Sequence, residues 1–138
     1  MSVAQTGQGS VATFTTAGTV FCARNITLPN LTMETIDASC LDSTGFTYKI
    51  SGDLVDAGEC TITAIFPVDQ PLVFPSVGAT DTLTITIPLK GAATSGTLSG
   101  TGFISSTQMP TLGLNELMEV ELTFVFDGVT GPAWTEAA

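Results

Sequence analysis

The chain has 138 residues, of which 43% are hydrophobic and 12% charged, and three basic residues stand against thirteen acidic ones for a formal net charge of -10. Neutralising phosphates requires clusters of Lys or Arg, and a membrane helix requires roughly 18 consecutive apolar residues, so we expect neither nucleic-acid recognition nor membrane insertion. The length suits one domain, and a mean hydropathy of +0.42 predicts apolar surface that contacts other subunits.

The composition favours strands over helices. The chain holds 14 Gly and 7 Pro and uses Thr heavily, and Thr is stiff at χ1 and fits pleated surfaces. Residues 1–9, which end in a Gly-rich sequence, are predicted to form a flexible N-terminal arm. Strands over 10–16 and 19–28 are predicted to form a hairpin with its turn at Ala17-Gly18, and Pro29 ends the second strand.

The next segment, residues 37–58, is too long for an ordinary connection. It mixes turn residues with a short apolar alternation of Phe46, Tyr48 and Ile50. Loops of this length usually have a function, so residues 38–58 are predicted to form a protruding loop or hairpin arm.

Within this segment, Asp42-Ser43-Thr44-Gly45 resembles the active-site sequence of an aspartic protease, in which Asp is followed by Thr or Ser and then directly by Gly. Here Thr44 intervenes, and the chain holds no second copy. The absence of histidine removes Ser-His-Asp and Cys-His mechanisms and the commonest zinc ligand. We therefore expect no enzymatic activity, and interpret Asp42 as the acceptor of an Asx-turn in which Gly45 has a positive φ.

No cofactor or metal ion is expected. Asp53 and Asp56 could join Asp42 as calcium ligands, but the spacing is not that of a known calcium loop, so solvated turn acids are the preferred interpretation. The odd number of cysteines and the lack of an evident signal peptide predict reduced, mostly buried thiols in a protein made in a cytoplasm. These are Cys22, Cys40 and Cys60.

Four strands are predicted in the second half. Residues 59–66 alternate, with Cys60, Ile62, Ala64 and Phe66 on one face, and residues 81–89 place Leu83, Ile85 and Ile87 inward with threonines outward. Residues 95–106 are Gly-rich for a strand, which predicts a bulge or close approach by another backbone. Residues 116–126 fit a helix at first, but alternation from Met118 to Phe126 favours a strand that places Glu119 and Glu121 on the opposite face.

The remaining segments carry fewer signals. Residues 68–79 contain two prolines and are predicted to be an ordered connection or a contact surface, and residues 128–138 a C-terminal tail. Phe14, Phe21 and Trp134 are assigned to the core or to an interface. The whole chain is thus predicted to be one all-β domain, a β-sandwich or barrel with little helix.

In the order of its motifs, the chain resembles the tail tube (major tail) proteins of long-tailed, non-contractile bacteriophages. The matching pieces are QGS at 8–10, ITLPNL at 26–31, ETID at 34–37, LDSTGF at 41–46, DAGECTITAIF at 56–66, LTITIPL at 83–89, GTGFISS at 100–106 and MEVELTFVF at 118–126. The chain departs from the family at residues 68–79, where many relatives carry a helix, and at Phe46, where many have Trp.

The resemblance implies a structural virion protein. Its subunits would form hexameric rings that stack into the tail tube, through which DNA passes into the host. The implied partners are further copies of the chain and the tape measure, tail tip and terminator proteins, and the implied location is the virion tail, assembled in the bacterial cytoplasm. We expect acidic side chains to line the lumen and the arm to reach a neighbouring subunit or ring. The predicted interface residues are Asp42, Ser43, Thr44, Gly45, Phe46, Tyr48, Lys49 and Leu54.

Two other structural roles remain open at this point. One is a monomeric immunoglobulin-like binding or decoration domain, which would lack ring-forming arms. The other is a tube protein of a contractile injection or secretion system, which shares the tube architecture.

Overall fold

A computed structural model describes residues 5–42, 44–69, 75–91 and 94–137. The expected all-β fold is confirmed, and the described residues include no helix. No described segment could therefore cross a membrane as a helix. The strands are β1 (Val11–Phe14), β2 (Gly18–Thr19), β3 (Ala23–Thr27), β4 (Thr32–Asp37), β5 (Lys49–Asp56), β6 (Glu59–Ile65), β7 (Thr80–Ile87), β8 (Gly96–Gln108), β9 (Glu119–Phe126) and β10 (Ala133–Thr135).

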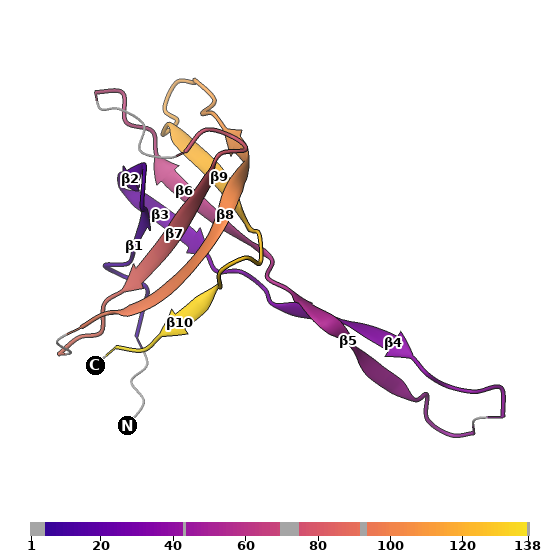
Figure 1. Ribbon diagram of the computed structural model, residues 1–138. Coiled ribbons are helices and arrows are strands. Elements are labelled where there is room, and N and C mark those ends of the chain that lie inside the picture. Colours follow the sequence, from indigo (N-terminus) through magenta and orange to yellow (C-terminus); the bar gives the residue numbers. More distant parts are fainter. Residues whose placement is uncertain (1–4, 43, 70–74, 92–93, 138) are drawn as a thin grey trace.

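Eight of the strands form one antiparallel sheet, which makes the body of the molecule. The hydrogen-bonded order is β2-β1-β7-β8-β9-β6-β3, and β10 pairs with the first part of β8. The sheet curves until β1 and β3, which stand near opposite ends of this order, come into contact. Figure 1 shows the result as a strongly curved body from which a separate two-stranded hairpin, β4 and β5, projects.

The core lies inside the curve of the sheet. In β6, β7 and β9 every second residue is buried, except Ile87 at the end of β7, which is partly buried, as the alternation of the sequence predicts. The ring of Phe14 on β1 meets that of Phe124 on β9 at a centroid distance of 5.8 Å, and Phe124 meets Phe126 edge to face at 5.2 Å. Aromatic pairs of this kind add to the free energy gained from burial. The core thus joins strands from both ends of the chain.

The glycines of β8 allow its neighbours to come close, which confirms the interpretation of residues 95–106. A Cβ atom on Gly102 would collide with the Val125 carbonyl oxygen of the paired strand β9, and one on Gly100 would lie 2.7 Å from the ring of Phe126. The register with β9 also shifts between Ile104 and Ser106, which marks the expected bulge. Side chains at these positions would separate β8 from the aromatic core.

Two sequence predictions need correction. The predicted strand 19–28 is interrupted, because Cys22 takes φ +45 in a turn between β2 and β3. Only β2 then pairs with β1, while β3 moves to the far end of the sheet and pairs with β6. The predicted C-terminal tail contains a strand, β10, in which Trp134 is the register partner of Leu98.

Candidate assembly surfaces

The hairpin of β4 and β5, which we call the arm, is the first candidate surface. The two strands pair with each other and with no other described strand, and all of their residues are exposed except Gly52, which is partly buried. The arm projects from the body in Figure 1, between β3 and β6 in the order of the chain. It begins six residues earlier than the sequence predicted, since β4 starts at Thr32.

The arm carries apolar side chains that its own chain does not cover. Across the hairpin, Met33 faces Val55 and Ile36 faces Ile50. These four side chains are between 42% and 55% exposed, although such side chains are usually buried. At the tip, Leu41 and Phe46 are almost fully exposed. Exposed apolar groups gathered on one element indicate a surface that contacts another molecule.

Local hydrogen bonds give the end of the arm a defined shape. The Ala38 N–H donates to the Tyr48 carbonyl oxygen at 2.9 Å, and the Tyr48 N–H donates to the Ser39 hydroxyl at 2.8 Å. The Ser39 N–H donates to the Asp37 carboxylate at 2.9 Å, and this bond is the main cause of the lowered pKa of Asp37. The Asx-turn recorded in this segment is therefore at Asp37. Gly45 has φ +84, as predicted.

The predicted interface residues all lie on the arm where the structure describes them, and all are exposed. The tip holds Asp42, Thr44, Gly45, Phe46 and Tyr48, whereas Lys49 and Leu54 lie on β5, and Ser43 is outside the described residues. Met33 and Ile36 on β4 are exposed apolar residues that the prediction did not include. The alternation Met33, Thr35, Asp37 is too polar to mark a strand with a buried face, so only the hairpin pairing reveals these apolar groups.

The outward face of the curved sheet is the second candidate surface, and it has two halves of different chemistry. Over β1, β7 and the first part of β8 it carries hydroxyl side chains, including Thr13, Thr84 and Ser99, which lie in adjacent register positions. Over β6 and β9 it carries Glu59, Glu119 and Glu121 between threonines. The acidic half is thus confined to one side of the sheet.

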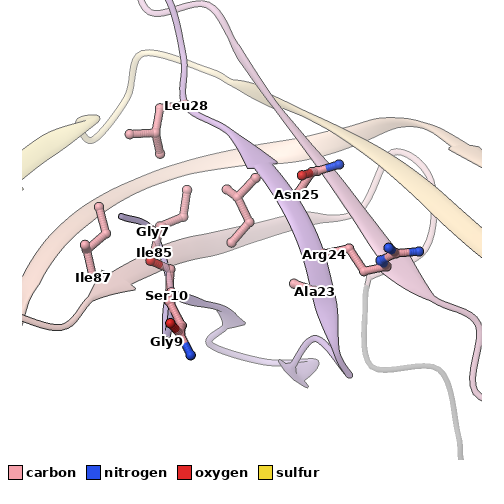
Figure 2. A pocket seen from close by; sticks show the side chains of 11 residues that line it. Gly7, Gly9, Ser10, Ala23, Arg24, Asn25, Leu28, Ile85 and Ile87 are labelled. Carbon is pink, nitrogen blue, oxygen red and sulfur yellow. The ribbon is translucent and has the colours of Figure 1, made fainter. Parts of the chain in front are cut away.

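The third candidate surface is an open groove of about 610 Å³, shown in Figure 2. It lies between the N-terminal segment, β3 and the end of β7. Its lining residues are Gly7, Gln8, Gly9, Ser10, Ala23, Arg24, Asn25, Ile26, Leu28, Ile85 and Ile87. We call this space the β3 groove.

The acidic residues form no cluster of metal ligands in the described part of the chain. No three Asp, Glu, Cys or His side chains gather there as metal ligands. Asp81 is buried, and its carboxylate accepts the Thr16 N–H at 3.1 Å and the Thr82 N–H at 2.7 Å. The Asp56 carboxylate accepts the Gly58 N–H at 2.9 Å, as expected of a turn acid. These carboxylates stabilise turns and strand ends.

The expectation of mostly buried thiols is wrong for two cysteines. Cys22 and Cys40 are exposed, because they lie in a turn and near the arm tip, whereas Cys60 is buried in the core. Burial raises the pKa of Cys60 to about 12. Since the thiolate is the reactive form, the folded protein protects this sulfur.

This difference in burial predicts the thiol chemistry of the protein. With Cys40 replaced by Ser, we expect one thiol, Cys22, to react with Ellman's reagent within minutes at pH 8, and Cys60 to react only after unfolding. Because the pKa of Cys60 is higher in the folded state, its contribution to stability is complete below the unfolded pKa of about 8.5 and is lost as the pH rises towards 12. Rapid reaction of two thiols in the folded protein would contradict this placement of Cys60.

Solved structures of other proteins share this fold. No protein-family model matches the chain, and no curated protein matches it. Among solved structures, a chain in the anti-feeding prophage cap, which terminates the AFP tube, is 14% identical with a TM-score of 0.69, and the match covers 100% of this chain and 95% of that one. A chain in the sheath/tube terminator of an extracellular contractile injection system, PVC, in its extended state is 15% identical with a TM-score of 0.69, covering 91% and 94%.

A chain in the six-fold symmetrised anti-feeding prophage baseplate is 11% identical with a TM-score of 0.70, covering 99% and 98%. The chain therefore has the fold of components of phage-tail-like particles. The second of these structures is a contractile injection system, one of the alternatives that the sequence leaves open, and none of the three is named as the non-contractile tail that the sequence resembles.

Proposed function

We propose that this protein is a structural subunit of the tube of a phage-tail-like particle, where copies of the chain close into rings and the rings stack. The observation that carries the proposal is the arm, whose apolar side chains project into solvent without cover from their own chain. A surface of this kind marks a site of contact with another molecule. The role is structural, and we propose no catalytic activity.

The similar structures favour a contractile system. They include a tube-terminating cap, a sheath/tube terminator and a baseplate. A subunit of the tube, or of the ring that terminates the tube, is compatible with all three of these structures. The tail tube of a non-contractile phage is the second candidate, because the order of the sequence motifs resembles that family. In either particle the partners are further copies of the chain and the neighbouring tail proteins.

The channel wall is the second part of the proposal. Six subunits in a ring would place one part of each outward sheet face towards the lumen. We propose the half over β6 and β9, where Glu119 and Glu121 project outward. Negative side chains there would repel DNA phosphates and so let DNA pass without binding.

Electron microscopy of the purified chain tests this proposal. We expect rings or stacked tubes in negative stain, with six-fold symmetry in class averages. A chain that remains monomeric at all concentrations, with or without the other tail proteins, would instead support the monomeric binding domain. A reconstruction that places Glu119 and Glu121 on the outer wall would contradict the proposed lumen.

A further inference from the structure

One wall of the β3 groove, the N-terminal segment, is held in place by contacts within the chain. The Gln5 side-chain amide donates to the Pro88 carbonyl oxygen at 2.6 Å, and the Ser10 N–H donates to the Gly7 carbonyl oxygen at 3.1 Å. Gly9 has φ +91, and its position is so close to Pro88 that a Cβ atom would lie 2.9 Å from the Pro88 ring. These contacts hold the N-terminal segment beside the end of β7. The groove is therefore formed before anything binds in it.

The lining of the β3 groove is of mixed polarity, with an apolar part formed by isoleucines, and one of its sides is an open sheet edge. Ile26, Ile85 and Ile87 line it, and Leu28 stands at one end with 44% of its surface exposed. β3 is the last strand in the sheet order, so one edge of its backbone has no strand partner among the described residues. Such an edge accepts another chain unless it is covered. The groove thus offers both apolar contact and backbone hydrogen bonds.

The charged residues near the β3 groove indicate which kind of segment could bind in it. Two of the three basic residues of the chain flank the groove: Arg24 on its rim, and Lys90 in an adjoining hollow that shares Gln8 with it. Arg24 is half-exposed and forms an ion pair with Glu119 at 3.7 Å, which partly balances its charge. The arm, residues 32–56, carries five of the thirteen acidic residues and only one lysine. An acidic element with apolar side chains therefore complements the groove.

We propose that the β3 groove of one copy receives the arm tip of another copy, with Phe46 and Leu41 as the apolar anchors. The volume of about 610 Å³ lies in the range of about 300–1,000 Å³ of ordinary binding pockets, so it holds a few large side chains and not the whole hairpin. Each copy supplies one arm and one groove, so the contact is head-to-tail and can close a ring or continue a stack. The inference rests on the assembly proposed above and names the surface that each arm contacts.

Cysteine cross-linking tests the contact in the assembled full-length protein. The background replaces Cys22 and Cys40 with Ser and keeps the buried Cys60. One variant adds Thr47→Cys, which is exposed and leaves the neighbouring anchor Phe46 in place, together with Leu28→Cys. The matched control adds Thr47→Cys and Leu112→Cys, because Leu112 is also exposed, at 77%, but lies between β8 and β9. After mild oxidation, we expect a ladder of linked chains on a non-reducing gel, at least tenfold stronger for the Leu28 variant than for the control.

The outcomes separate this inference from the proposed function. If rings or tubes form but position 47 does not link to position 28, or links equally to position 112, the groove is not the receptor and the proposed function stands. If Leu28 is linked only when another tail protein carries the second thiol, the groove binds that protein and the inference is wrong. If the background protein forms no assemblies at all, both proposals fail.

Discussion

Removal of the arm is expected to give a folded monomer that no longer assembles. The variant replaces residues 32–56 with Asn-Gly, a sequence that forms tight hairpin turns. The join is possible because the chain enters and leaves the arm at one place: a Cβ atom on Gly58 would lie 2.6 Å from the Asn30 carbonyl oxygen. Since no core residue lies on the arm, the melting temperature should change by only a few degrees. Rings and tubes should disappear in electron microscopy and sedimentation.

The matched control keeps the arm and removes its anchor. Phe46→Ala leaves the hairpin backbone intact, because Phe46 is 97% exposed and supports nothing in its own chain. Aromatic residues that fill a partner's pocket dominate binding energies. We expect assembly to weaken by about tenfold or more, which corresponds to about 1.4 kcal/mol. Long tubes formed by the armless chain would show that assembly uses another surface.

Truncation of the central aromatic side chain is expected to have the largest effect on stability. Phe124 is fully buried and contacts the rings of both Phe14 and Phe126. Phe124→Ala removes these contacts and leaves a cavity among buried side chains. The expected loss is about 3–5 kcal/mol of unfolding free energy. Domains are stable by only about 5–15 kcal/mol, so this loss removes a substantial part of the total stability.

Chemical denaturation followed by circular dichroism measures this loss. Phe46→Ala is again the control, because it removes the same side chain from an exposed position. The two variants should behave oppositely: Phe124→Ala loses stability, whereas Phe46→Ala loses only assembly. A change of less than 1 kcal/mol for Phe124→Ala would contradict the position of Phe124 in the core.

The alternation of apolar and polar residues was sufficient to predict the strands around the core. In β6, β7 and β9 each inward residue named from the sequence is buried or partly buried, because one face of each strand meets the core. The glycines of 95–106 also predicted close approach correctly, since a missing Cβ has few other uses inside a strand. Positive φ at Gly45 followed from its place in a turn.

The sequence pattern predicted only part of the arm. Phe46, Tyr48 and Ile50 marked part of it, but β4 was missed because its residues face solvent on both sides and so lack the alternation that burial imposes. The sequence also did not show that the strand predicted over 19–28 divides into β2 and β3. This division depends on Cys22 in a left-handed conformation, which is rare for cysteine and has no signature in the sequence.

The sequence by itself thus determined the all-β class, the inward residues of the long strands and the lack of histidine-based chemistry, because these depend on residue type and on contacts near in the chain. Only the tertiary structure decided that β3 joins the far end of the sheet and that an N-terminal segment completes a groove beside it. Strand order depends on contacts between residues distant in sequence, and periodicity carries no information about which strands pair.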